Sequence, residues 1–376
     1  MIYRILEKQI LKSLRPGRAV CLLGARRTGK TVLMQRIKGL VKTRALLVQG
    51  DNLEAAEILG SQRLEKLRGL VRGYGCLMVD EAQAVPNIGP NLKLLIDNEP
   101  GLTVFITGSS AFDLKGRVGE PLVGRSLYLH LYPISQLELM ESEDSLTASQ
   151  RLESRLIYGA YPQVITAETE KEKRDHLQSI RDGYLLKDIL ALDNLKDSLF
   201  VFNLLRMLAF QIGQDVSFAE LASNLNVHAK TVRRYLELLE KTFALFSHQG
   251  YSRNLRKEYT KSPRYYFWDN GIRNALISNF NPLHLRDDAG RLWENYCITE
   301  RIKRNAYKQQ AVNYYFWRTY DQKEIDLIEE RGGRLHGYEF KWAAARAKKP
   351  LEFLSAYKDS AYRVVNRDNY LDYIAR

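Results

Sequence analysis

Residues 19–40 read AVCLLGARRTGKTVLMQRIKGL, and within them Gly24-Ala25-Arg26-Arg27-Thr28-Gly29-Lys30-Thr31 has the spacing GxxxxGK[ST]. Five apolar residues precede this stretch and an amphipathic helical pattern follows it, which is the strand–loop–helix context that a phosphate-binding loop requires. Glycine at positions 24 and 29 lets main-chain amides approach phosphate oxygens without a Cβ in the way. The stretch therefore predicts a nucleotide site within a parallel α/β sheet.

The loop residues divide the work of holding a triphosphate. Lys30 is expected to reach the β- and γ-phosphates, and the Thr31 hydroxyl is expected to ligate Mg²⁺, so we expect ATP and Mg²⁺ as cofactors. The predicted nucleotide-binding residues are Gly24, Ala25, Arg26, Arg27, Thr28, Gly29, Lys30, Thr31 and Val32.

Two later strand ends carry groups that complete this chemistry. Cys76-Leu77-Met78-Val79-Asp80-Glu81 is an apolar strand that ends in two carboxylates. Asp80 is predicted to hold Mg²⁺, directly or through water, and Glu81 is predicted to polarise the attacking water. The next strand ends Thr107-Gly108-Ser109-Ser110. We expect Ser109 to sense the γ-phosphate, with a helix N-cap role as the alternative.

Periodicity along the 376 residues divides the chain into four parts. Short apolar segments alternating with helical patterns predict a parallel α/β domain over 1–136, and a helical lid follows over 137–195. We expect a winged helix-turn-helix over 196–283 and a second α/β domain over 284–376. The strands expected in the first domain are Ala19–Leu23, Ala45–Gln49, Cys76–Val79, Thr103–Thr107 and Leu127–Leu131.

The net charge of +13 is distributed unevenly. Residues 1–50 carry +11, residues 51–200 carry −7 and residues 201–376 carry +9. Basic regions at two places favour contact with a polyanion, and solvated helix faces are the alternative. Three cysteines in a chain of 376 residues exclude a disulfide scaffold. No apolar run is long enough for a membrane span and no secretory signal is recognisable, so we expect a cytoplasmic protein without membrane contact.

A helix-turn-helix is predicted around the turn Asn226-Val227-His228, because a short helix ends before it and another begins near Lys230. His228 is interpreted as a turn residue rather than a metal ligand. Winged-helix modules also serve as packing domains, and that alternative stays open. The side chains predicted to contact DNA are Lys230, Thr231, Arg233 and Arg234 on the helix, and Arg253, Arg256, Lys257, Lys261 and Arg264 in the wing.

Near the C-terminus, Glu324-Ile325-Asp326-Leu327-Ile328 and Gly337-Tyr338-Glu339-Phe340-Lys341 read as two strands joined by a glycine turn. Strand alternation puts Glu339 and Lys341 on one face, which Asp326 would share. Two carboxylates and a lysine at one point can bind Mg²⁺ and orient a water toward a phosphodiester. The alternative is a charged strand face exposed to solvent.

The order of these segments resembles the AAA+ ATPases, and more closely a prokaryotic, archaeal-ATPase-like group that joins such a domain to a C-terminal domain of unknown function. The resemblance implies that Arg125, just before the fifth strand, is offered to the γ-phosphate of a neighbouring subunit, with a surface salt bridge as the alternative. The segments that carry it are GARRTGKT (24–31), LMVDEAQ (77–83), TGSSA (107–111), LVGRSLYLHLYPIS (122–135), GAYPQV (159–164), YLLKDI (184–189) and SPRYYFWDNGIRNAL (262–276).

The C-terminal strand pair is similar to the PD-(D/E)XK, or restriction-endonuclease-like, fold. Asp326, Glu339 and Lys341 fall at its signature positions, with Ile325 where the pattern has proline, and Glu294 matches an additional acid of many members. The resemblance implies a nuclease-like fold in which cleavage is either retained or lost.

The sequence as a whole predicts an ATPase that acts on or with DNA, as a homo-oligomer if the AAA+ interfaces are used. One alternative is a nucleotide-controlled binding switch with an inactive nuclease-like domain, and another is a scaffold for protein partners. The predicted catalytic residues are Lys30, Glu81, Ser109 and Arg125 for ATP, and Asp326, Glu339 and Lys341 for DNA, with Thr31, Asp80, Asp326 and Glu339 as metal ligands.

Overall fold

The computed structural model describes residues 2–109, 121–185, 198–252, 262–319, 323–343 and 349–375. The chain divides into two compact units. The described part of the first unit comprises residues 2–109, 121–132 and 241–243, and the second unit comprises the remainder. Each unit contains one sheet, and the two are described separately.

The first unit is built on a five-stranded sheet in which every neighbouring pair is parallel. Its order is β2-β3-β4-β1-β5, which places the strand before the phosphate loop near the middle. The five strands agree with the predicted ones to within one residue at each end, which confirms the α/β prediction for this unit. The strands are β1 (Ala19–Leu23), β2 (Ala45–Gln49), β3 (Cys76–Asp80), β4 (Thr103–Gly108) and β5 (Ser126–His130).

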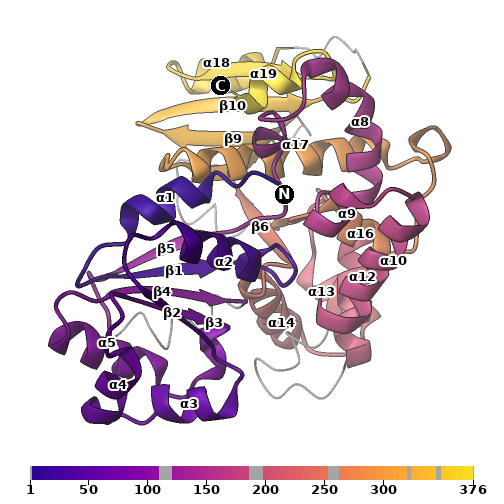
Figure 1. The fold of residues 1–376 in the computed structure, drawn as a ribbon. Coiled ribbons are helices and arrows are strands. Elements are labelled where there is room, and N and C mark those ends of the chain that lie inside the picture. The colour runs from indigo at the N-terminus through magenta and orange to yellow at the C-terminus, as the bar shows by residue number, and fades with distance from the viewer. Residues whose placement is uncertain are drawn as a thin grey trace. The chain divides into compact units, whose positions relative to one another are not determined.

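Helices cover both faces of this sheet, with α1 and α2 on one side and α3, α4 and α5 on the other (Figure 1). All five residues of β1 and of β3 are buried, whereas the edge strands β2 and β5 are partly exposed. Central strands of a parallel sheet are continuous apolar runs because both of their faces are covered. The helices are α1 (Leu6–Ser13), α2 (Lys30–Leu40), α3 (Leu53–Leu59), α4 (Leu64–Val71) and α5 (Ile88–Asn98).

The second unit begins with helices. Among the helices that the structure describes, none combines the length and the apolar character needed to cross a bilayer. The helices before the second sheet are α7 (Gln136–Leu139), α8 (Ser145–Tyr158), α9 (Pro162–Thr166), α10 (Glu170–Ile180), α12 (Ser198–Phe210), α13 (Phe218–Asn224) and α14 (Ala229–Lys241). Those that follow are α16 (Asn270–Leu276), α17 (Ala289–Tyr307), α18 (Leu351–Ala356) and α19 (Tyr370–Ala375).

The second sheet has six strands in the order β11-β10-β9-β8-β6-β7. The hairpin of β6 and β7 that follows α14 does not stand apart as a wing, because β6 also pairs in parallel with β8. Strands β8, β9 and β10 are antiparallel neighbours, and β11 lies parallel to β10. The strands are β6 (Leu245–Gly250), β7 (Arg264–Phe267), β8 (Asn313–Arg318), β9 (Glu324–Arg331), β10 (Arg334–Phe340) and β11 (Ala361–Val365).

Two of the segments that carry the family resemblance, residues 159–164 and 262–276, meet at a buried polar junction. The Asp269 carboxylate accepts from the Ala160 amide at 2.7 Å, and burial raises its pKa. The Asn274 side chain donates to the Ile157 carbonyl at 2.8 Å. A Cβ added at Gly271 would lie 2.1 Å from the Tyr158 carbonyl oxygen. These residues therefore fix the end of α8 against α16.

Substitution of Gly271 with alanine tests this junction. We expect Gly271→Ala to lower the free energy of unfolding by about 1–3 kcal/mol, because the new methyl group displaces packed main chain. Gly290→Ala is the matched control, since Gly290 is also the second residue of a helix but has nothing within 4 Å of the added Cβ. Urea unfolding measures both, and equal stabilities of the two variants would contradict the packing described.

Candidate nucleotide site

The phosphate loop leaves β1 at Gly24 and enters α2 at Lys30. A Cβ added at Gly24 would lie 2.3 Å from the Leu131 carbonyl oxygen, so the chain passes there only without a side chain. Gly29 has φ of 96°, a conformation that residues with a Cβ rarely adopt. The two glycines thus allow the tight turn that directs the loop toward the N-terminus of α2.

Lys30 is the first residue of α2, and its side chain is directed back over the loop. Its Nζ donates to the carbonyl oxygens of Gly24 at 2.9 Å and of Ala25 at 3.0 Å, and the residue is 4% exposed. Thr28 is buried, and its hydroxyl donates to the Ala25 carbonyl at 2.8 Å. The ammonium group is therefore held inside the curve of the loop, where phosphates bind in such loops.

Arg4, ahead of α1, braces this loop. Its Nη1 donates to the Thr28 carbonyl at 2.9 Å and its Nη2 donates to the Tyr132 carbonyl at 2.7 Å. Sequence reasoning missed this residue, because Arg4 lies outside any motif. The basic character of the first segment is the one signal that points to this residue, and that charge is interpreted above as favouring contact with a polyanion.

The Asp80 carboxylate joins the first turn of α2 to two strand ends. The Thr31 hydroxyl donates to Asp80 Oδ2 at 2.6 Å, and the Thr107 hydroxyl donates to Asp80 Oδ1. Asp80 is only 1% exposed. A threonine hydroxyl and a carboxylate side by side are the oxygen ligands that Mg²⁺ prefers, so these residues fit the predicted ion.

The network continues from Asp80 to the other predicted catalytic groups. Thr107 Oγ1 accepts from the Glu81 amide at 3.1 Å, and the Gln83 side chain donates both to Glu81 Oε2 and, at 3.2 Å, to Ser109 Oγ. Glu81 has φ of 51°, which is uncommon for a residue with a side chain. The structure thus brings Glu81 and Ser109 together through Gln83. Sequence reasoning gave Gln83 no role.

The remaining loop residues differ in exposure. Arg26 and Arg27 are half-buried, and the Val32 side chain is 53% exposed, which leaves its main chain as the part near the loop. Arg125 precedes β5 and pairs with Asp97. Because β5 runs parallel to β1, Arg125 lies at the edge of the sheet opposite to the phosphate loop of its own chain.

The predicted DNA-binding residues lie partly within the structure. Lys230, Arg233 and Arg234 are exposed at the start of α14, and Thr231 is half-buried. Arg253, Arg256, Lys257 and Lys261 lie outside the described residues.

The prediction for Arg264 is wrong. Its side chain is 5% exposed and forms ion pairs with Asp215 and Glu324, both at 2.8 Å, because β7 is the edge strand of the second sheet rather than a solvated wing.

The C-terminal carboxylates lie near one another. The Phe340 amide donates to Asp326 Oδ2 at 2.7 Å, and Lys341 Nζ pairs with Glu339 Oε1 at 2.7 Å. The Tyr266 hydroxyl donates to Glu294 Oε1 at 2.9 Å. Burial raises the pKa of Asp326 well above its ordinary value, with the charges of Glu294 and Glu339 adding to the effect.

Burial also raises the pKa of Glu294 to about 7. The acids therefore repel one another in a desolvated place, which disfavours their simultaneous ionisation. Within the part of the chain that the structure describes, no three His, Cys, Asp or Glu side chains are gathered around a point that would hold a metal ion. Asp326 and Glu339, the two predicted metal ligands, lie near one another, and their metal-binding role stays a prediction.

Comparison with family models agrees with the geometry of the loop. Residues 16–140 match an AAA domain, residues 149–283 match a domain of unknown function (DUF8612) and residues 289–373 match another (DUF4143). In its loop, its strand order and this match, the first unit is similar to an AAA-type P-loop domain.

Two relatives align with this chain over most of its length. An uncharacterized protein of Mycobacterium tuberculosis is 29% identical over 340 residues, which cover 89% of this chain and 72% of the relative. An uncharacterized protein of Haemophilus influenzae is 25% identical over 337 residues, covering 83% and 79%.

Among solved structures, Thermotoga maritima RuvB is 18% identical over 68% of this chain and 91% of its own, with a TM-score of 0.30. A Bacteroides Pif1 helicase is 14% identical over 48% and 50%, with a TM-score of 0.25.

Proposed function

We propose that this chain binds ATP with Mg²⁺ at residues 24–32 and hydrolyses it. The observation that carries the proposal is the continuous hydrogen-bonded network that joins Thr31, Asp80, Thr107, Glu81, Gln83 and Ser109. It links the groups that hold the triphosphate to the groups that activate water. A strand–helix turn with no catalytic role has no need of such a chain of polar groups in a buried place.

Each residue has a part in this proposal. Lys30 contributes a buried ammonium to the β- and γ-phosphates, while Thr31 and Asp80 hold Mg²⁺, which supplies neutralisation of phosphate charge when bound. Glu81 accepts a proton from the attacking water, and Gln83 orients its carboxylate. The side-chain amide of Gln83 also donates to Ser109, so a contact between Ser109 and the γ-phosphate would reach Glu81 through Gln83.

Two substitutions separate binding from turnover. We expect Lys30→Ala to abolish ATP binding, because the buried ammonium held inside the loop is lost. We expect Glu81→Gln to keep ATP affinity within about threefold while slowing hydrolysis by about 100-fold or more, since only the proton acceptor is lost. Calorimetry measures the affinity and phosphate release measures the rate. Hydrolysis by Glu81→Gln at the unsubstituted rate would show that the base is another residue.

Substitution of Arg125 tests whether a neighbouring copy of the chain takes part in hydrolysis. We propose that it reaches the nucleotide of a neighbouring copy, because it lies at the edge of the sheet opposite to its own loop. Arg125→Ala should then keep ATP affinity and slow hydrolysis only under conditions in which the protein is oligomeric. Equal rates at all protein concentrations would leave Arg125 as the surface partner of Asp97.

We propose that α14 contacts nucleic-acid phosphates. Lys230, Arg233 and Arg234 are exposed over its first two turns, and the buried residues Val232, Leu236 and Leu239 lie on the other face. Separation of basic and apolar faces is what a helix needs in order to pack on its own unit while presenting cations outward. DNA is the partner that we favour. A packing module for proteins remains the alternative.

Salt dependence tests this contact. Each phosphate contact that is lost should reduce the slope of log K against log salt by about 0.9 for duplex DNA, so Lys230→Ala with Arg233→Ala should reduce it by about 2. Lys171→Ala, on the exposed face of α10, is the control and should leave the slope unchanged. Fluorescence anisotropy with labelled duplex measures both. A slope that is the same in all three proteins would remove α14 from the interface.

For the second sheet we propose a binding module rather than an active nuclease. The order helix, three strands, helix, strand, helix over residues 289–375 and the nearby Asp326, Glu339 and Lys341 support a nuclease-like fold. Among the described residues, however, no group of three His, Cys, Asp or Glu side chains could hold a metal ion. The nucleotide-controlled switch is therefore the reading that the geometry favours for this part of the chain.

Cleavage assays decide between the two. With Mg²⁺ or Mn²⁺ and labelled single-stranded or duplex DNA, we expect the unsubstituted protein and Asp326→Asn to give equal, background cleavage. Lys341→Ala serves as the second variant, because it removes a half-exposed group that pairs with Glu339. Metal-dependent cleavage that disappears in both variants would instead establish a nuclease.

A further inference from the structure

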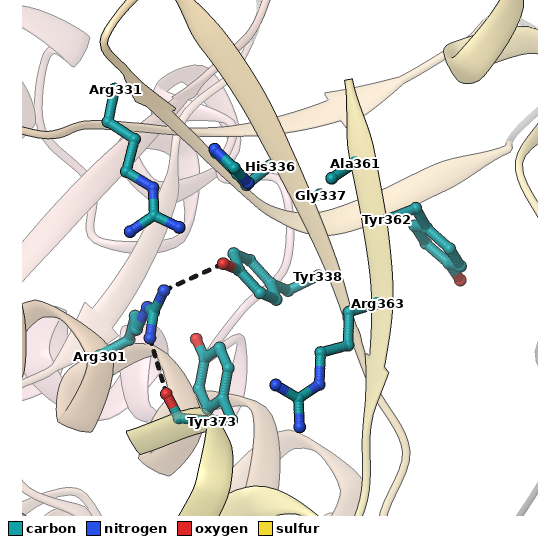
Figure 2. Close-up of a pocket in the computed structure, with 9 residues that line it drawn as sticks. All are labelled: Arg301, Arg331, His336, Gly337, Tyr338, Ala361, Tyr362, Arg363 and Tyr373. Carbon is teal, nitrogen blue, oxygen red and sulfur yellow. Dashed lines mark hydrogen bonds between the residues drawn. The ribbon is translucent and has the colours of Figure 1, made fainter. Parts of the chain in front are cut away.

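The second unit contains a pocket of about 200 Å³ that none of the functions above uses. It lies where strands β9, β10 and β11 meet helices α17 and α19, as Figure 2 shows. Ala361 and Gly337 contribute little side-chain volume to its lining. The polar residues that line it are Arg301, Arg331, His336, Tyr338, Arg363 and Tyr373.

One wall of the pocket is a fixed, buried guanidinium. Arg301 donates from Nε to Glu329 Oε1 at 2.8 Å and from Nη2 to Glu329 Oε2 at 3.0 Å, and its Nη1 donates to the Tyr373 carbonyl at 2.6 Å. The side chains of Arg301 and Glu329 are 4% and 0% exposed. The Tyr373 hydroxyl is buried without a hydrogen-bond partner among the described residues. Such a donor is costly to bury unless something pairs with it.

The rim of the pocket carries charge that the described residues do not compensate. Arg331 is half-buried, and within the described part of the chain its side chain makes no hydrogen bond or ion pair. Arg363 donates to Asp372 at 2.9 Å and is 37% exposed. Figure 2 shows the guanidinium groups of Arg301, Arg331 and Arg363 around the same space. Glu329 pairs with Arg301 and Asp372 pairs with Arg363, so Arg331 is the lining arginine for which the described residues supply no ion pair.

This positive charge shifts the pKa values of neighbouring basic side chains. Burial lowers the pKa of His336, and Arg331 and Arg301 lower it further. Burial likewise lowers the pKa of Arg304, with Arg301 and Arg331 adding to the shift. Nearby positive charge therefore disfavours the protonated forms of His336 and Arg304. A bound anion would offset that charge.

We propose that this pocket binds a phosphate monoester, carried either by a free nucleotide or by the end of a nucleic-acid strand. Guanidinium forks match the oxygens of a phosphoryl group, and Arg331, His336 and the Tyr373 hydroxyl supply further donors. A volume of about 200 Å³ accepts a phosphoryl group with part of its sugar and excludes a duplex. The proposal does not depend on the phosphate loop, because every residue that it uses belongs to the second unit.

The test compares two arginines at the turn between β9 and β10. Arg331 lines the pocket, whereas Arg334, its cross-strand partner, is exposed and does not. Both variants are made in the chain that also carries Lys30→Ala, so that the phosphate loop does not bind the nucleotide. In this background we expect Arg331→Gln to weaken binding of AMP or of a 5′-phosphorylated trinucleotide by about tenfold. Arg334→Gln should change it by less than about twofold. Calorimetry at low salt measures both.

Further probes identify the source of the phosphoryl group and can overturn the proposal. Equal affinity for AMP and for the phosphorylated trinucleotide indicates a free nucleotide, and tighter binding of the trinucleotide indicates a strand end. Equal binding of the trinucleotide with and without its 5′-phosphate, no saturable binding at millimolar concentration, or equal affinities of Arg331→Gln and Arg334→Gln would each refute the pocket. Unfolding midpoints check the fold, which Arg331→Gln should preserve because no bond is lost.

Discussion

The carboxylate of Asp80 is a charge withdrawn from water at the end of β3, and the arrangement of the first unit follows from satisfying it. Hydroxyls from α2 and from β4 reach it, so the first turn of a helix and the ends of two neighbouring strands must lie at the same place. A buried carboxylate with only neutral donors retains an uncompensated charge, for which a divalent cation is a suitable partner. The tight glycine loop, the bracing by Arg4 and the unusual backbone of Glu81 all surround this one group.

In the second unit, buried polar residues hold the helices in fixed orientations. They do not add hydrophobic stabilisation. Asp269 and Asn274 hold the end of α8, and Arg301 with Glu329 holds α17 to its sheet. A buried ion pair adds little net stability because desolvation offsets the attraction, yet loss of one partner is costly. The Arg331 pocket and the acids near Asp326 lie in this same unit, which suits it to recognising ligands in fixed orientations.

The sequence was sufficient for the first sheet because its strands are continuous apolar runs and its loop is a specific motif. It predicted Lys30, Thr31, Asp80, Glu81 and Ser109 near one another, and the structure brings them together. It did not predict Arg4 or Gln83, whose partners depend on tertiary placement. Nor did it predict that β6 and β7 join the second sheet, since strand propensity does not specify which strand is the neighbour. The burial of Arg264 follows from that pairing.

The central claim is that the buried Asp80 and the phosphate loop together hold ATP through Mg²⁺. Calorimetric titration of the full-length protein with ATP, in Mg²⁺ and again in excess chelator, tests it most directly. The account predicts one ATP bound per chain in Mg²⁺ and binding weaker by about tenfold or more without it, since Thr31 and Asp80 would hold an ion that neutralises phosphate charge. Absence of binding, or the same affinity in both conditions, would contradict it.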